Sequence, residues 1–336
     1  TEHESGQAPD TGVRDMAQIF DITPRSRDIS PVLMLVTSHR MDCFLLCLKC
    51  LELYTDLSRF RKIYVLANDV TDEHAVMIKS FQHRHRHVID IHLTPRGTTP
   101  AVVAMQNFIM ARHPGEVFVK LEEDVFVTPG WLEQLLAAYK LHQGSPRVAA
   151  VAPVMPVTRT GRQVMARLLR MHYPRERQRL PDLPVERNAL YHRLVWDKVL
   201  TDDLAGKFAA LEKPRHYYLS HASNNVILWG PRLTDLLAPM SLKPVDGVGR
   251  PDEFALNSVL RMCDMRVLVV TSALAHHFSH AGCEEYLRRY VSMDDVWWYM
   301  TGLVESAPTW GGIGRGGERG LRKGRQGPGG MLRVLR

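Results

Sequence analysis

Apolar runs of strand length alternate with stretches of helical period along the first half of the chain. Continuous apolar runs between polar turns are typical of strands buried on both faces, whereas apolar residues repeating every three or four positions indicate helices. The predicted strands lie at 31–38, 61–69, 87–95, 116–127 and 147–154, and the predicted helices at 42–54, 72–84, 99–112 and 130–140. This alternation predicts an α/β fold, with a mostly parallel sheet and helices on both of its faces.

The pattern changes at residue 157. Residues 157–215 are rich in Arg, Pro and aromatic residues and have a weak helical period, which predicts a helical insertion. Two interpretations of it stay open: an excursion with solvated arginines, or a lid or substrate-binding subdomain. Strand-like runs return at 224–230 and 265–273, and a helical stretch at 251–263 separates them.

The two ends of the chain lack this periodicity. Residues 1–29 are polar and predict a flexible arm, and the basic, glycine-rich residues 311–336 predict a disordered tail. The segments 30–156 and 216–310 then form two halves of the fold on either side of the insertion.

Polar residues follow the predicted strands where each strand ends. They include Ser38 and Arg40, Asp69, Arg96, and the three acids from Glu122 to Asp124. Ligands of parallel α/β sheets bind at the carboxyl ends of the strands, so we expect these side chains to face one crevice.

The three consecutive acids lie between apolar runs in "VKLEEDVFV". Since an unpaired buried carboxylate costs several kcal/mol, they need water, a basic side chain or a metal as partner. Glu122 and Asp124 should point to one side, where their oxygens suit Mg²⁺ or Mn²⁺, and Glu123 should point the other way, held by solvent or a basic side chain.

Composition narrows the class of protein. The chain has 336 residues, 45% of them hydrophobic, which suffices for a substantial core. The net charge of +7 sits almost wholly in residues 311–336, which hold seven Lys or Arg and one Glu. The remainder is close to neutral, so no nucleic-acid partner is expected.

The cysteines and hydropathy bear on location. Cys47 and Cys50 lie in an apolar helical run and indicate core packing rather than a metal or redox pair. No apolar run is long enough for a transmembrane segment, and no secretory leader is recognisable. We therefore expect a cytoplasmic protein with reduced thiols, for which peripheral membrane contact stays open.

In their order and spacing, these segments resemble the nucleotide-sugar glycosyltransferases of GT-A fold, most closely the inverting family-2 type. That family has an apolar strand ending in acid-x-acid, then proline, a small residue and Trp-Leu-Glu, similar to "FVKLEEDVFVTPGWLEQL". Its first two strands resemble "PVLMLVTSHRM" and "IYVLANDVTDEH". The similarity is close over residues 31–155 and looser over 220–280.

The resemblance implies that residues 30–156 bind a nucleotide sugar and that residues 216–310 form the acceptor side. A divalent cation, Mn²⁺ or Mg²⁺, would be bound by Asp124, with Glu122 as an atypical partner because the family usually has Asp there. A late histidine, His276 or His277, would complete the metal site. For the donor, the resemblance implies Asp69 at the nucleotide base and Glu122 at the ribose. Ser38, Arg40 and Arg96 are candidates by their positions at strand ends, where a cation could meet the pyrophosphate.

The resemblance also implies the reaction. An acid pair opens a helix in "PDEFALNSVLRMCDMRVLVV", where the family keeps its catalytic base. By position relative to Leu256, Glu253 is the first candidate and Asp252 the second. The carboxylate would take the proton from an acceptor hydroxyl, of a carbohydrate or another molecule, as it attacks the sugar with inversion. A UDP-sugar is the favoured donor.

Two other functions are compatible with this fold. A sugar-phosphate nucleotidyltransferase would have a glycine-rich first turn and a lysine after the first strand, and "VTSHRMD" has neither. A binding protein that has lost turnover would explain the departures at Glu122 and at the Asp252–Glu253 pair.

Overall fold

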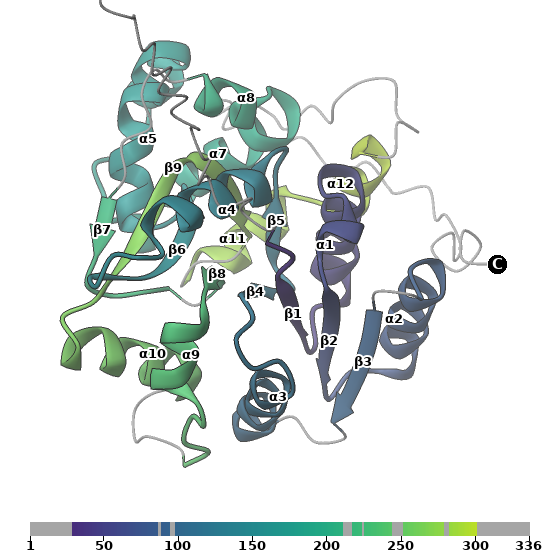
Figure 1. Cartoon of the computed structure of the whole chain (residues 1–336). Helices are drawn as coiled ribbons and strands as arrows, with labels where there is room; N and C mark the ends of the chain where they lie inside the picture. Colours follow the sequence, from purple (N-terminus) through teal and green to yellow (C-terminus); the bar gives the residue numbers. More distant parts are fainter. Residues whose placement is uncertain are drawn as a thin grey trace, which may run out of the picture.

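One mixed sheet of nine strands forms the centre of the part of the chain that the structure describes (Figure 1). The computed structural model describes residues 29–86, 89–94, 98–210, 217–223, 225–243, 251–278 and 282–300. The strands follow the order β3-β2-β1-β4-β8-β6-β9-β5, and β7 pairs with β9 outside this path. The strand bounds are β1 (Val32–Thr37), β2 (Lys62–Asn68), β3 (Ile89–Thr94), β4 (Phe118–Glu122), β5 (Val125–Val127), β6 (Val148–Val154), β7 (Tyr217–Leu219), β8 (Val226–Trp229) and β9 (Arg266–His277).

Helices connect most of the strands, and the helix predicted at 72–84 has the same bounds in the structure. The bounds are α1 (Met41–Tyr54), α2 (Asp72–Arg84), α3 (Thr99–Arg112), α4 (Trp131–His142), α5 (Arg159–His172), α6 (Pro174–Gln178), α7 (Ala189–Thr201), α8 (Leu204–Ala209), α9 (Pro231–Leu237), α10 (Pro251–Met262), α11 (Cys283–Tyr290) and α12 (Met293–Met300), with 3-10 turns η1 (Leu57–Arg59) and η2 (Val185–Arg187).

The sheet is mostly parallel, as predicted. Strands β3, β2, β1 and β4 all run parallel, and so do β6 and β9. Strand β8 lies between β4 and β6 and runs antiparallel to both. Because β8 runs antiparallel to both of its neighbours, β6 and β4 run in the same direction. The carboxyl ends of β4 and β6 therefore lie at the same edge of the sheet.

Helices cover both faces of the sheet because successive side chains of each strand point to opposite sides. Leu33 and Leu35 pack in a core with α1, α2 and α4, whereas Val32 and Met34 pack in a second core with α3, α9 and α10. Each fully buried Leu or Val contributes roughly 1.5–3 kcal/mol to stability. The predicted α/β fold class is confirmed.

The prediction of one strand over 116–127 is wrong, because the chain turns at Glu123 and Asp124. Strand β4 ends at Glu122 and pairs with β1 and β8, while β5 starts at Val125 and pairs antiparallel with β9. An apolar run on both sides of the acids gives no signal that its two parts have different partners.

Helix α4 starts at Trp131, one residue after the start of the predicted helix. Its N-cap is Gly130 at φ 76°, a left-handed conformation that suits glycine. The Thr128 hydroxyl donates to the carbonyl of Leu274 at 2.7 Å. This bond ties the turn after β5 to β9.

The insertion is helical, as expected. Its described part contains α5, α6, α7 and α8, and apolar residues of α5, α7 and α8 are buried in a third core against β9. Met165 and Leu168 of α5 and Tyr191 of α7 are buried in that core. Among the described residues, we find no helix that is long and apolar enough to span a bilayer.

Candidate active site

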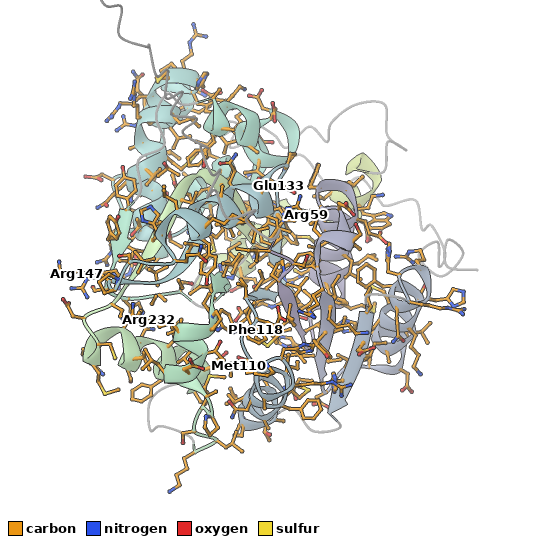
Figure 2. All side chains as sticks on the ribbon, viewed as in Figure 1. Arg59, Met110, Phe118, Glu133, Arg147 and Arg232 are labelled. Atoms are coloured by element: carbon orange, nitrogen blue, oxygen red, sulfur yellow. The ribbon has the colours of Figure 1, made fainter. Side chains whose placement is uncertain are left out.

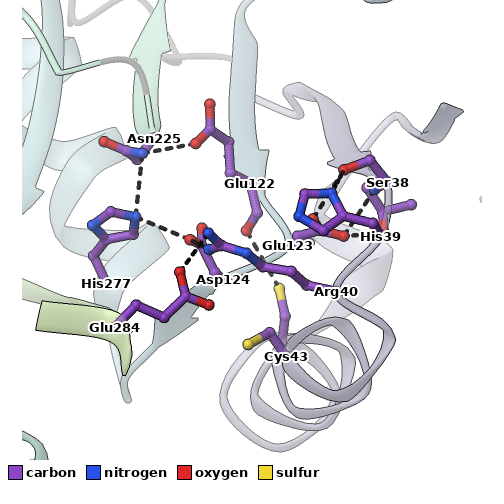
Figure 3. A network of polar contacts seen from close by, with 12 residues as sticks. Ser38, His39, Arg40, Cys43, Glu122, Glu123, Asp124, Asn225, His277 and Glu284 are labelled. Carbon is purple, nitrogen blue, oxygen red and sulfur yellow. Dashed lines mark hydrogen bonds and ion pairs between the residues drawn. The ribbon is translucent and has the colours of Figure 1, made fainter. Parts of the chain in front are cut away.

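Strands β1 and β4 end side by side, and their ends bring the predicted polar residues together. The two strands are paired in register from Val32 opposite Phe118 to Val36 opposite Glu122. The turn after β1 contains Ser38 and Arg40, and the turn after β4 contains Glu123 and Asp124. Figure 3 shows these side chains converging with residues from β8, β9 and α11.

Glu123 points toward β1 and is 7% exposed. Its Oε2 accepts from the Thr37 hydroxyl at 2.7 Å and from the Ser38 backbone N–H at 2.8 Å. The Ser38 hydroxyl donates to Oε1 at 3.2 Å. The expectation of solvent or a basic side chain as partner is wrong, since hydroxyl and amide donors satisfy this carboxylate. Glu123 therefore fixes the turn in which Ser38 lies.

Asp124 points the other way and is 5% exposed. Its carboxylate accepts from Arg40 and lies 3.1 Å from Nε2 of His277. Arg40 also donates to Glu284 of α11 at 2.8 Å. We call Arg40, Asp124, His277 and Glu284 the arginine cluster (Figure 3). The Arg40 side chain is 21% exposed, so its guanidinium group reaches the solvent side of this cluster.

A second charged cluster lies beneath the surface on the other side of Glu122. Lys120 of β4 is 2% exposed, and its Nζ contacts Glu122 Oε1 at 3.1 Å and Asp252 Oδ2 at 2.7 Å. Gln106 of α3 donates to the same Asp252 oxygen at 3.1 Å. We call Lys120, Glu122, Asp252 and Gln106 the lysine cluster. This cluster joins Glu122 of the E-x-D motif (Glu122 to Asp124) to the acid pair of α10. The residues in contact, Lys120 and Asp252, are 132 positions apart in the sequence.

The charges of the lysine cluster stabilise one another. Burial would raise the pKa of Asp252, but the ion pair and hydrogen bond with Lys120 outweigh it and lower that pKa to about 2. Burial would lower the pKa of Lys120, but Asp252 and Glu122 raise it above its ordinary value. Both groups therefore stay charged at neutral pH.

Lys120 was not among the predicted site residues. The signal is a lysine inside the apolar strand "VFVKLE", where a solvated side chain has no room. Lys120 shares the strand face of Phe118, which packs in the second core, so it points toward α3 and α10. A lysine there needs acidic partners, and Asp252 is the partner that pattern reasoning could have sought.

Asn225, at the start of β8, connects the two clusters. Its Nδ2 donates to Glu122 Oε2 at 2.7 Å and lies 3.4 Å from His277 Nε2. The Glu122 backbone N–H donates to the Asn225 carbonyl at 2.9 Å. Asn225 therefore links Glu122 to the histidine that lies beside Asp124.

Asp252 and Glu253 differ in their surroundings although they are neighbours on α10. Asp252 is 6% exposed and belongs to the lysine cluster. The Glu253 side chain is 27% exposed, and its Oε1 lies 3.7 Å from Nε2 of the exposed His221. Of the two carboxylates, Glu253 is the one that a solvent molecule or ligand can reach.

His276 and His277 also point to opposite sides, as neighbours on a strand do. The His276 ring stacks on Trp196 of the insertion, with ring centroids 4.3 Å apart, and is 1% exposed. Burial, together with His277 and His192, holds the pKa of His276 well below its ordinary value. The structure brings His277, but not His276, to Asp124.

Of the other predicted donor residues, Asp69 follows β2, the neighbour of β1 in the sheet. It is exposed and has φ 57°, so the backbone turns sharply there. Arg96 lies outside the described residues, and so do residues 311–336 of the predicted tail and residues 1–28 of the predicted arm.

The donor atoms near Asp124 fit a divalent cation in part. Within the described ranges, no group of three or more His, Cys, Asp or Glu side chains is arranged to hold a metal ion. Asp124 and His277 nevertheless offer one carboxylate and one imidazole 3.1 Å apart at the edge of the sheet. Mg²⁺ and Mn²⁺ accept such ligands, and Mg²⁺ usually keeps waters and substrate phosphates in its remaining positions.

Sequence comparison finds no relative, since no protein-family model and no curated protein matches the chain. Solved structures resemble its fold. The mannosyltransferase PcManGT from Pyrobaculum calidifontis, in complex with GDP-Man and Mn²⁺, is 12% identical with a TM-score of 0.47, over 84% of this chain and 69% of that one. GalNAc-T7 with UDP, GalNAc and Mn²⁺ is 11% identical with a TM-score of 0.49, over 85% of this chain.

Residues 1–349 of TarS from S. aureus are 9% identical, with a TM-score of 0.44, over 81% of this chain. This chain spans 71% of that TarS fragment and about half, 52%, of GalNAc-T7. At these identities and TM-scores we base the function on the residues of this chain.

Proposed function

We propose that this chain is a glycosyltransferase that moves a sugar from a nucleoside diphosphate sugar, with a UDP-sugar as first candidate, to an acceptor hydroxyl with inversion. The observation that carries this proposal is the contact of Lys120 with both Glu122 and Asp252. This contact brings the two acid motifs that the sequence singled out into one cluster at the end of β4, which supports assigning them to one site. Sugar transfer requires such a pairing, with donor-binding acids near a base.

The donor side of the proposed site is the arginine cluster and the turn after β1. Arg40 can offer guanidinium N–H groups to a diphosphate, because its side chain is 21% exposed and lies at the end of β1. Ser38 lies in the same turn, and Asp69 at the end of β2 would contact the nucleotide. Glu122 would serve the ribose or the cation, next to Asn225.

Asp124 and His277 would hold the divalent cation, Mn²⁺ or Mg²⁺, which when bound would neutralise the negative charge of the leaving diphosphate. His276 is dropped from this set because its ring packs against Trp196.

Glu253 would act as the base. The acceptor oxygen attacks the anomeric carbon, the bond from that carbon to the diphosphate oxygen breaks, and the nucleoside diphosphate leaves with the electron pair. Glu253 takes the proton of the acceptor hydroxyl during the attack. Asp252 stays ionised against Lys120 and positions the start of α10, where the neighbouring Glu253 is partly exposed.

A donor panel tests the proposal. The protein is incubated with UDP-, GDP-, ADP- and dTDP-sugars, with Mn²⁺, Mg²⁺ or EDTA, and both free nucleoside diphosphate and the melting temperature are measured. We expect one donor class to raise the melting temperature and to release its nucleoside diphosphate slowly to water. Release of the opposite anomer of the sugar, followed by NMR, is the result expected for inversion. A chain that neither binds nor cleaves any donor in the panel would contradict the proposal.

A further inference from the structure

Arginines are concentrated along α5, α6 and the residue that follows α6. Residues 159–179 contain seven arginines and a single acid, Glu176. The arginines are Arg159, Arg162, Arg167, Arg170, Arg175, Arg177 and Arg179. Figure 2 shows side chains with nitrogen tips projecting outward around α5, at the end of the molecule away from α9 and α10. Like charges spaced along about six helical turns repel one another and destabilise the helices. Their presence on α5 and α6 therefore requires an explanation.

The apolar face of α5 explains how this helix is held, but not why its other face is basic. Met165, Leu168 and Leu169 are buried in the third core. Arg159 and Arg162 have acidic partners, Glu186 at 3.5 Å and Asp182 at 3.7 Å. Packing and ion pairing therefore account for one face of the helix and its first turn.

Four other arginines, Arg167, Arg170, Arg175 and Arg177, are all exposed. Among the residues that the structure describes, none of the four side chains makes an ion pair or hydrogen bond. We call these four side chains the basic face. Within the described part of the chain their charges have no acidic partner, so they can meet an external anionic one.

Exposed apolar side chains lie on the same segment as the basic face. Met171, adjacent to Arg170, is 55% exposed, and Leu183, whose carbonyl accepts from Arg162 of α5, is 42% exposed. Cationic side chains beside exposed apolar ones match an interfacial helix, which meets anionic headgroups with its charges and the acyl boundary with its apolar groups.

The basic face lies on the segment that follows β6, whose carboxyl end is on the same edge of the sheet as that of β4. We propose that the basic face docks this chain on the surface of an anionic membrane, peripherally and reversibly. The docked segment, α5 and α6, would then extend from the same edge of the sheet as Glu122.

An anionic bilayer fits better than a nucleic acid. Nucleic-acid surfaces usually combine a basic groove with aromatic stacking platforms. The basic face lies instead on the outward side of α5 and α6, and the exposed apolar side chains on the same segment are Met and Leu. Thioether and aliphatic side chains suit contact with lipid acyl chains better than stacking on nucleobases.

Vesicle sedimentation of the full chain tests this inference. The vesicles are phosphatidylcholine alone, or phosphatidylcholine with one third phosphatidylglycerol, at low and high salt. We expect binding to the anionic vesicles alone, weakened by salt. Neutralising the four charges in R167Q/R170Q/R175Q/R177Q should reduce binding by about fivefold for each arginine, and so by at least a hundredfold in all.

A matched variant controls for total charge and for the basic residues 311–336. R112Q/R147Q/R232Q/R261Q removes four exposed arginines near α3, α9 and α10, far from α5 in Figure 1. We expect this variant to bind anionic vesicles like the unmodified chain. Thermal melts of both variants check folding, which exposed substitutions should change little.

Three outcomes would overturn the inference. The first is equal loss of vesicle binding in both quadruple variants, and the second is equal binding by the unmodified chain to neutral and anionic vesicles. The third is binding to duplex DNA, but not to vesicles, that disappears in R167Q/R170Q/R175Q/R177Q. None of these measurements depends on sugar transfer, so the proposed function can fail or hold independently.

Discussion

The lysine cluster and the arginine cluster lie on either side of Asn225, and each places a cation between two acids. Lys120 is 2% exposed and contacts Glu122 and Asp252 in a layer between β4, α3 and α10. Arg40 contacts Asp124 and Glu284 and is 21% exposed. The cation is thus buried in the lysine cluster and partly exposed in the arginine cluster.

This difference separates fixed charges from exchangeable ones. Removing one partner of a buried ion pair lowers the free energy of unfolding strongly. The remaining charge is then buried with neither water nor an opposite charge to stabilise it. Arg40 is partly exposed, so water and a ligand can replace a partner that it loses, and its pairs should cost less to open. The lysine cluster should therefore hold the architecture of the site, and the arginine cluster should exchange partners with the donor.

The largest expected effect is on the lysine cluster. Lys120→Met would leave Glu122 and Asp252 buried beside an apolar side chain, at a cost of about 3–5 kcal/mol in the free energy of unfolding. Urea denaturation measures it. Lys62→Met is the matched control, since Lys62 contacts Asp90 across the solvated end of β2 and should cost about 1 kcal/mol or less. Similar losses in the two variants would remove the distinction between the clusters.

The next largest effect distinguishes the roles of Glu253 and Asp252 on α10. Glu253→Gln should lower the rate of transfer by about 10²–10⁴-fold with donor affinity unchanged, because the base acts only on the acceptor proton. Single-turnover assays and donor titrations measure the two quantities. Asp252→Asn should instead lower the free energy of unfolding, since it breaks the contact with Lys120. Full transfer by the Glu253 variant would move the base to another residue.

Acid should weaken the lysine cluster in a narrow pH range. The pKa of Asp252 is about 2 in the folded chain and 3.8 ordinarily. A lowered pKa means that the unfolded chain binds the proton first, so the stabilisation is present above pH 3.8 and is lost between about pH 4 and pH 2. The loss should be about 2 kcal/mol. Denaturation series from pH 5 to pH 2 should show this component in the unmodified chain and not in Asp252→Asn.

The smallest effect concerns Arg40. Arg40→Gln should weaken donor binding by about tenfold, the worth of one charge-assisted contact, and change the free energy of unfolding by 1 kcal/mol or less. Calorimetric titration with a nucleoside diphosphate and a urea series measure the two quantities. Arg61→Gln, which removes the exposed pair with Glu116, should leave binding unchanged. A large loss of stability with intact binding would make the arginine cluster structural too.

Much of the sheet could be predicted because burial leaves a local trace. The apolar runs became β1, β2, β3, β4 and β6, and the helix over 72–84 has the predicted bounds. What could not be predicted depends on pairing. Strand β8 lies antiparallel between β4 and β6, and β4 and β5 pair with different strands. Both features depend on contacts between distant segments, which the local hydrophobic pattern does not reveal.

The same limit applies to the site. The sequence could name Asp124, Glu253 and the pair of histidines, but only the register of β9 decides that His277 faces Asp124 and His276 faces Trp196. Lys120 was missed because its partner Asp252 lies far away in the chain. Glu123 was assigned to solvent or a basic side chain because hydroxyl and amide donors at the end of β1 carry no charge signal.

Calorimetric titration of Asp124→Asn with UDP and GDP, with and without Mn²⁺, tests the central claim most directly. Asp90→Asn, a change of the same kind on β3, is its control. We predict that the unmodified chain and the control bind one nucleoside diphosphate more tightly with Mn²⁺, and that Asp124→Asn loses this metal-dependent gain. Equal metal-dependent binding by all three proteins would contradict the assignment of the donor site to Asp124.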